Sequence, residues 1–287
     1  MKVGIGLPGN IPGTKGDFIL DWARKADEGP FSSVGTIDRL VYDNYEPLVL
    51  LSAAAGATSR VRLLTGVLLA PLRNPGVLAK QAASLDAISG GRLTLGVGVG
   101  RRPDDYEAAP AEYQQRGRQM NRTLATMRRI WSGGEVGDGI GPMGPAPVQQ
   151  GGPEVLIGAG TPQAVRRVGR YADGFIAAAG NAAAVRELYV VAEESWKAAG
   201  RSGSPRLAGV ASYALGPNAA DKVGGYIRHY YSFLGDAAEQ MARNAISTPE
   251  AVKDTIRDME SIGMDEVVFL PSVSEMDQLE RLADVIG

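Results

Sequence analysis

The chain contains no cysteine and a single histidine among its 287 residues. The absence of thiols excludes disulfides, thiolate nucleophiles, iron–sulfur clusters and thiolate zinc sites. One imidazole, that of His229, is too few for a histidine-based metal site and leaves a hydrolase triad without support. The sequence therefore predicts no metal site.

Long hydrophobic runs are also absent. No stretch approaches the ~20 apolar residues of a membrane span, and the opening MKVGIGLPGN lacks the apolar run of a secretory signal, so a cytoplasmic protein is expected. The net charge is −2, and lysine and arginine are scattered rather than clustered. Neither a nucleic acid nor an anionic membrane is therefore expected as a partner.

Short β-type runs alternate with helical patterns along the chain. Strands are expected at 2–8, 32–38, 60–69, 92–100, 154–160, 173–179, 206–216 and 265–271. Helices are expected at 17–29, 46–57, 75–89, 114–131, 162–171, 182–199, within 219–243, at 249–262 and at 274–286. Eight strands with intervening helices predict one (β/α)8 TIM barrel over residues 1–287. The Gly/Pro-rich segment 132–153 is expected to be an irregular excursion, because the alternation resumes after it.

The fourth expected strand carries Gly96, Gly98 and Gly100 on one face, followed by Arg101 and Arg102. Each interior glycine costs roughly 0.5–1 kcal/mol relative to alanine. Ligands of TIM barrels bind at the carboxyl ends of the strands. We therefore expect this glycine face to let a flat ring approach the backbone, with the arginines meeting an anionic tail.

The sequence GAGTP follows the fifth expected strand and leads into a helix at Thr161-Pro162. Free amides and the positive end of a helix dipole at such a turn form a phosphate site. The alternative is a well-capped turn with no ligand, and the residues alone leave both interpretations open.

A Rossmann dinucleotide site is the main structural alternative, because GIGLPG at 4–9 matches the pattern G-x-G-x-x-G. That interpretation would make the chain an NAD-binding dehydrogenase. The fingerprint needs its glycines to open a helix, whereas Pro8 and Pro12 bracket a loop and a helix can hardly begin before Asp17. The barrel is therefore preferred.

Three segments together resemble the luciferase-like flavin- or deazaflavin-dependent oxidoreductases: RNPGVLAKQAASLDAISGGRLTLGVGVG (73–100), VLIGAGTPQAVRRVGRYADGFI (155–176) and TPEAVKDTIRDMESIGMDEVVFLP (248–271). The resemblance implies a (β/α)8 barrel of the luciferase-like monooxygenase family. It also implies FMN or the 5-deazaflavin coenzyme F-420 as cofactor, and hydride transfer or oxygenation of a small organic substrate. A homodimer is a further expectation.

The resemblance also implies positions for the cofactor. Its ring would lie against an irregular, often cis, peptide late in the third strand. The residues implied for the whole site are Gly66 and Val67 at that peptide, Gly98, Val99, Gly100 and Arg101 at the end of the fourth strand, and Gly158, Ala159, Gly160 and Thr161 at the phosphate turn.

Asp38 and Arg39 end the second expected strand, and they are the catalytic candidates. Many relatives have a histidine where this chain has Arg39. A guanidinium cannot act as an ordinary proton donor at neutral pH, but it can stabilise an oxyanion or a phosphate. Two alternatives remain: a simple ion pair between Asp38 and Arg39, and a protein that binds and stores the cofactor without catalysis.

Overall fold

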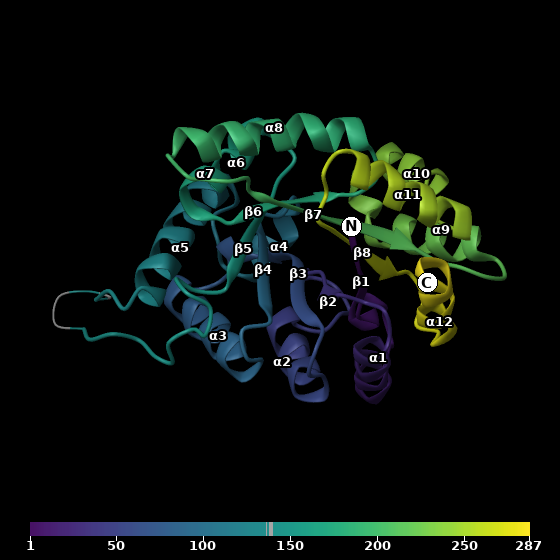
Figure 1. Cartoon of the computed structure of the whole chain (residues 1–287), viewed down its shortest axis with the longest axis horizontal. Coiled ribbons are helices and arrows are strands. Elements are labelled where there is room, and N and C mark those ends of the chain that lie inside the picture. The colour runs from purple at the N-terminus through teal and green to yellow at the C-terminus, as the bar shows by residue number, and fades with distance from the viewer. Residues whose placement is uncertain (136, 138–139) are drawn as a thin grey trace.

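The computed structural model describes residues 1–135, 137 and 140–287. Within these residues, eight parallel strands form a closed barrel in which each strand pairs with the next and β8 pairs with β1 (Figure 1). The strands are β1 (Lys2–Gly6), β2 (Ser33–Thr36), β3 (Arg62–Leu69), β4 (Leu93–Gly98), β5 (Glu154–Gly158), β6 (Gly174–Ala178), β7 (Arg206–Tyr213) and β8 (Glu266–Pro271). The fold is the predicted (β/α)8 barrel, so the open-sheet Rossmann interpretation is wrong: Pro8–Asn10 forms a short 3-10 turn where a helix would have to begin.

Helices surround the barrel. They are α1 (Gly16–Glu28), α2 (Pro47–Ala57), α3 (Pro75–Ile88), α4 (Pro103–Ala108), α5 (Arg116–Trp131), α6 (Pro162–Val165), α7 (Arg167–Tyr171), α8 (Ala182–Ala198), α9 (Ala219–Tyr230), α10 (Asp236–Arg243), α11 (Pro249–Ser261) and α12 (Asp277–Ile286). None of the helices in the described ranges has the length and apolar character needed to cross a bilayer.

Two helical regions differ from the sequence prediction. The single helix expected at 162–171 is divided at Arg166 into α6 and α7. Arg167, the first residue of α7, donates to Gly117 O and to Asn121 Oδ1 on α5, at 3.0 and 2.6 Å, which anchors the second piece to a neighbouring helix. The short helix α4 was not expected. Within the predicted excursion at 132–153, residues 136, 138 and 139 lie outside the described structure.

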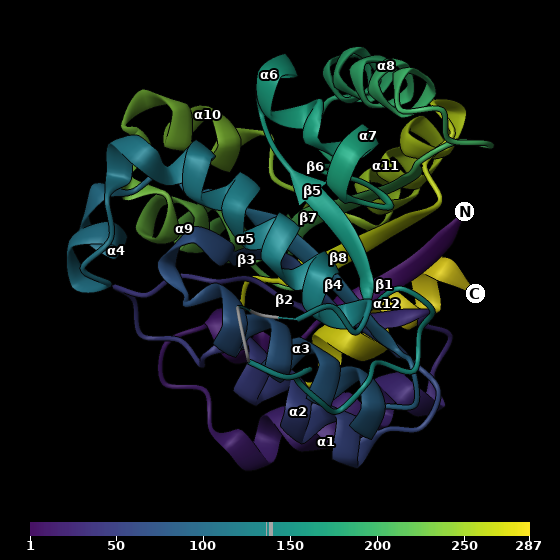
Figure 2. The same ribbon diagram turned by 90° about the vertical axis from the view of Figure 1, so that its left-hand side faces the viewer.

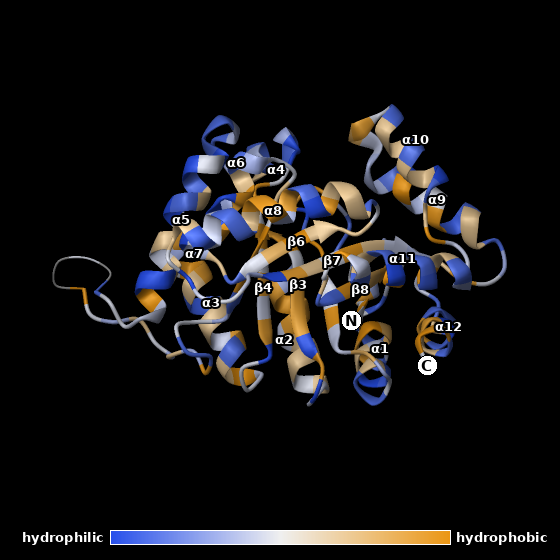
Figure 3. Ribbon diagram, turned by 45° about the horizontal axis from the view of Figure 1, so that its top comes forward, coloured by the Kyte–Doolittle hydropathy of each residue, from blue (hydrophilic) through white to orange (hydrophobic). Residues whose placement is uncertain are grey.

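Alternation along the strands divides the apolar side chains into two cores. Outward-facing residues such as Leu95 and Val97 pack against the helices. Inward-facing residues fill the barrel, among them Leu64, Leu156 and Val268. The barrel strands are largely orange in Figure 3, whereas the helices alternate between orange and blue, because only one side of each helix is buried.

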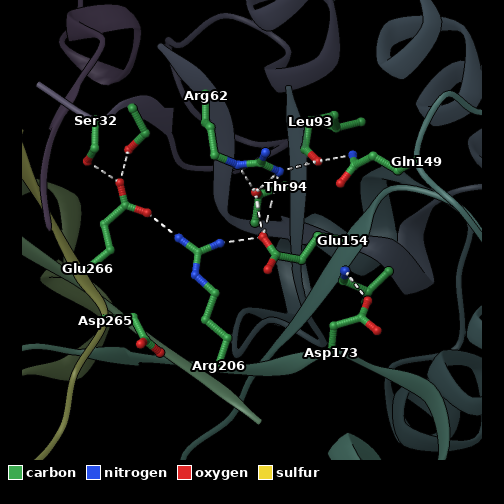
Figure 4. Close-up of polar contacts among 12 residues, drawn as sticks. Ser32, Arg62, Leu93, Thr94, Gln149, Glu154, Asp173, Arg206, Asp265 and Glu266 are labelled. Carbon is green, nitrogen blue, oxygen red and sulfur yellow. Dashed lines mark hydrogen bonds and ion pairs between the residues drawn. The ribbon is translucent and has the colours of Figure 1, made fainter. Parts of the chain in front are cut away.

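The amino end of the barrel is occupied by an ion network (Figure 4). Arg206 pairs with both Glu154 and Glu266, and Glu266 also accepts from Ser32 Oγ and, at 2.7 Å, from Ser33 Oγ. Figure 2 places both chain termini at this end and α4, α9 and α10 at the opposite end. The carboxyl ends of the strands are therefore the end at which a ligand site remains to be sought.

Asp27, near the end of α1, gives the fold a measurable pH dependence. Its carboxylate accepts from the N–H groups of Ser59, Arg60 and Val61, each at 2.8 Å. Burial opposes the charge, but these hydrogen bonds prevail and lower the pKa of Asp27 to about 2. The interaction therefore stabilises the fold fully above the pKa of the unfolded carboxyl, and this contribution is lost as the pH falls from about 4 to about 2.

We expect Asp27→Asn to lower the free energy of unfolding by about 1 kcal/mol at pH 7, a value reduced for solvent screening of a partly exposed group. Urea denaturation of both proteins between pH 2 and 7 measures this difference, which should vanish near pH 2. A difference that stays constant over the whole range would contradict the assignment.

Candidate active site at the carboxyl ends of the strands

The third strand is irregular where the sequence resemblance implied it. The Gly66-Val67 peptide is cis, and the pairing register of β3 with β4 shifts between Thr65 and Leu68. At this bulge the Val67 side chain lies beside Gly98 of β4 and Gly158 of β5.

The glycine face of β4 accommodates this bulge. A Cβ at Gly96 would lie 2.0 Å from the carbonyl oxygen of Thr65. Cβ atoms at Gly98 and Gly158 would each lie 2.6 Å from a methyl group of Val67. The expected open face is thus corrected: β3 already fills the space beside Gly96 and Gly98. The role of Gly98 in cofactor binding stays a prediction, and it would act through the position of Val67.

The loop after β4 is held by two tyrosines. Tyr106 of α4 donates its hydroxyl proton to the carbonyl oxygen of Val99, and Tyr113 donates to that of Arg101 at 3.2 Å. Gly100 has a φ of +72°, which favours glycine. The Arg101 side chain is exposed and has no ion-pair partner within the described ranges.

The turn after β5 offers unused hydrogen-bond donors. Within the part of the chain that the structure describes, the N–H groups of Ala159, Gly160 and Thr161 donate to no protein acceptor. The Thr161 side chain caps no backbone N–H of α6. Because α6 has only four residues, its dipole is small, so the helix contributes less to an anion site than the sequence predicted. The free N–H groups remain suited to phosphate oxygens.

Asp38 does not pair with Arg39. Its carboxylate accepts from Arg73 Nη1 at 2.6 Å and from the N–H of Leu69 at 2.8 Å, and Arg73 also binds Glu46 at 2.9 Å. Burial raises the pKa of Asp38 above its usual range, while the charge of Arg73 opposes that rise. The ion-pair alternative for Asp38 and Arg39 is therefore wrong, and Asp38 instead joins β2 to the end of β3.

Arg39 is a buried cation without an acidic partner in the described chain. Its Nη1 donates to the carbonyl oxygen of Tyr230 at 2.9 Å, and its Nη2 donates to that of Val41 at 2.8 Å. The guanidinium carbon lies 4.7 Å from the ring centre of Tyr42 and 5.0 Å from that of Tyr230. Asp105, which could otherwise neutralise it, accepts instead from the N–H groups that follow Arg39. Burial opposes the charge of Asp104, but Arg102 and, more weakly, Arg39 lower the pKa of Asp104. The Arg39 charge thus acts on one nearby acid without forming an ion pair with it.

Helix α9 contributes an aromatic wall to this end of the barrel. The rings of Tyr226 and Tyr230 stack with centroids 5.5 Å apart, and both side chains are almost fully buried. Burial raises the pKa of each phenol well above its usual range, so both hydroxyls are neutral. Asn10, in the turn after β1, donates its amide to the Tyr226 hydroxyl.

The bulged third strand, the free amides after the fifth strand and the buried arginine after the second all lie at the carboxyl ends of the strands, where parallel barrels bind their ligands. Residues 1–266 match the luciferase-like monooxygenase family, and the chain belongs to that family. This is a family of oxidoreductases that includes deazaflavin-dependent dehydrogenases and FMN-containing monooxygenases.

Relatives match over part of their length. The chain is 35% identical over 169 residues to an uncharacterised protein of Mycobacterium tuberculosis, covering 56% of this chain and 60% of that one. It is 31% identical over 205 residues to the F420-dependent glucose-6-phosphate dehydrogenase of Nocardia farcinica, covering 66% and 55%. The chain thus spans little more than half the length of these curated relatives.

Solved structures share the fold over almost the whole chain. The monooxygenase RslO1 from Streptomyces bottropensis superposes with a TM-score of 0.76 at 23% identity, covering 100% of this chain and 97% of that one. An F420-dependent secondary alcohol dehydrogenase superposes with a TM-score of 0.80 at 17% identity, covering 99% and 97%. At these identities the likeness establishes the fold alone.

Several residues at this end of the barrel escaped the sequence prediction of the site. Arg73 was placed after the third strand, but its pairing with Asp38 was not foreseen. Asn10 was not assigned to the site, and the aromatic neighbours of His229, Tyr230 among them, were interpreted as lining either the pocket or a subunit interface. The only sequence signal for them was position: Asn10 follows β1, and the aromatic run YIRHYYSF follows β7. Both follow strands whose carboxyl ends form the mouth of the barrel.

Proposed function

We propose that this protein is an oxidoreductase that binds coenzyme F-420 and transfers a hydride between it and a small organic substrate. FMN is the alternative cofactor. The observation that carries the proposal is the convergence of the Gly66-Val67 bulge, the end of β4 and the free N–H groups at 159–161. A ring beside Val67 would place its phosphate-bearing chain toward those N–H groups.

The charges around the turn favour the deazaflavin, whose tail carries more negative charge than that of FMN. Arg101, Arg118 and Arg166 are exposed and have no ion-pair partner in the described ranges. The Arg167 side chain donates to the carbonyl oxygen of Gly117. Arg118 follows Gly117 and Arg166 precedes Arg167, so these two exposed arginines lie on segments that are in contact. Such a group of arginines suits a polyanionic tail.

When bound, the cofactor supplies the redox chemistry, and the residues of this chain bind and orient. Arg39 is the proposed contact to a substrate oxygen, where a fixed positive charge stabilises developing negative charge. Asp38 is a positioning residue, because it fixes the ends of β2 and β3 through Arg73 and Leu69. Tyr226 and Tyr230 keep water from the inner side of the mouth.

Isothermal titration calorimetry with coenzyme F-420, FMN and NAD tests the proposal. We expect tight binding of coenzyme F-420, weaker binding of FMN and none of NAD. Gly98→Val should lower the cofactor affinity by about 10- to 100-fold, because the added methyl groups displace Val67 in a packed site. Circular dichroism checks that the variant is folded.

Two results would argue against the proposal. Tight binding of NAD alone would remove the cofactor assignment. A protein that binds the deazaflavin but never exchanges a hydride with added alcohols or ketones would fit the cofactor-storage alternative. The expected homodimer is a separate prediction, which sedimentation equilibrium measures.

A further inference from the structure

Four buried polar atoms in the loops at the mouth of the barrel have no hydrogen-bond partner in the described chain. Asn44 Oδ1 belongs to a half-buried residue, and the other three, Asn10 Oδ1, Arg39 Nε and Ser272 Oγ, belong to buried ones. These three residues are only 1, 9 and 3% exposed. They follow β1, β2 and β8, which are consecutive around the barrel. Because unpaired buried polar groups destabilise a fold, three of them on one arc indicate a ligand that supplies their partners.

The other atoms of these side chains determine what the free atoms can do. Asn10 Nδ2 donates one hydrogen bond to the Tyr226 hydroxyl, which leaves Oδ1 as an acceptor. Both terminal nitrogens of Arg39 bind backbone carbonyl oxygens, which leaves the Nε proton as a donor. The Ser272 hydroxyl can both donate and accept. The arc therefore presents an acceptor, a charged donor and a hydroxyl.

Two tyrosine rings of α9 pack next to Asn10 and Arg39. Tyr226, which holds Asn10, stacks on Tyr230 with ring planes inclined by 22°, and Arg39 lies over the Tyr230 ring. Asp38, which precedes Arg39 in sequence, is bound by Arg73, and Asp105 accepts from the two backbone N–H groups that follow Arg39. Against the effect of burial, Arg102 and then Arg39 lower the pKa of Asp104, but Arg39 forms no ion pair in the described chain, so its Nε proton is free for a ligand oxygen.

We propose that Asn10, Arg39 and Ser272 recognise the substrate, and that the substrate is a hydroxylated carbonyl compound with a flat apolar body. Its hydroxyl donates to Asn10 Oδ1, and its carbonyl oxygen accepts from Arg39 Nε and the Ser272 hydroxyl. The flat body lies along the tyrosine wall. This inference rests on the proposed function, which places the substrate at this end of the barrel, and it concerns recognition alone.

Titration calorimetry with two matched probes tests the inference. They are acetophenone and the α-hydroxy ketone 2-hydroxy-1-phenylethanone, which carries its hydroxyl on the carbon next to the carbonyl group. The cofactor-loaded wild-type protein should bind the hydroxylated probe about tenfold more tightly, the effect of one added hydrogen bond to a buried acceptor. Asn10→Ala should reduce this ratio to about one. Ser272→Ala should weaken the binding of both probes by about five- to tenfold while leaving their ratio unchanged, because Ser272 contacts the oxygen that the probes share.

Thr123→Val is the matched control. Thr123 Oγ1 is also buried and unpaired, but it lies on α5 outside the arc, so this variant should bind both probes as the wild type does. Thermal unfolding of the cofactor-free variants checks folding, and Ser272→Ala should melt no lower than the wild type. Equal affinities for the two probes in the wild type, or no binding of either, would overturn the inference. Cofactor binding, measured separately, decides the proposed function.

Discussion

Arg39→Ala is expected to lower kcat/KM by about 10²- to 10³-fold, roughly the effect of removing one preorganised donor to a developing negative charge. Arg39 is 9% exposed and forms no ion pair in the described structure, so its charge is placed to act on an oxygen that enters the mouth. Steady-state kinetics on the cofactor-loaded protein measures the loss. Arg39→Lys should retain part of the activity, because lysine keeps the positive charge but lacks the planar guanidinium that donates several hydrogen bonds in fixed directions.

Arg186→Ala is a suitable control for the loss of an arginine beside a tyrosine. Arg186 lies 5.4 Å from the Tyr189 ring on α8, and it pairs with Glu193 at 3.0 Å, away from the proposed site. Its removal should leave kcat/KM unchanged. Two results together would contradict this role of Arg39 in stabilising negative charge on the substrate. The Lys and Ala variants would lose turnover equally while substrate binding stays intact, and one limb of the wild-type pH profile would be missing in both variants.

Arg206→Leu is expected to destabilise the fold by about 3–5 kcal/mol, the usual effect of leaving a buried charge without its partner. The Glu266 side chain is 1% exposed, and Arg206 is its cationic partner in the network of Figure 4. Glu154, at 22% exposure, loses the same partner and keeps the more distant Arg62 at 3.8 Å and a hydrogen bond from Thr94 Oγ1 at 2.8 Å. Urea denaturation at pH 7 measures the change.

The double variant Arg206→Leu with Glu266→Gln should recover part of this loss, because a neutral amide can still bond to Ser32 and Ser33 without a buried charge. Cofactor affinity should stay unchanged in both proteins, since the network lies at the amino end of the barrel, opposite the proposed site. Equal stability of the single and double variants would contradict this explanation.

The sequence by itself determined the barrel. All eight strands and most helices lie where alternation, proline and glycine predicted them, because these signals depend on residues close together in the chain. The resemblance to a family likewise located the irregular peptide at Gly66-Val67, which is cis in the structure. The turn at 158–161 was predicted as a phosphate site, and it carries free N–H groups.

Only the tertiary structure decided which side chains meet. Asp38 pairs with Arg73, 35 residues away, rather than with the adjacent Arg39. The glycines of β4 accept the bulge of β3, and Arg206 joins two acids that are 52 and 60 residues distant. Asn10 and Ser272 stand near opposite ends of the chain and follow neighbouring strands. These contacts arise from the closure of the barrel, which brings distant strand ends together, and no local pattern encodes such a pairing.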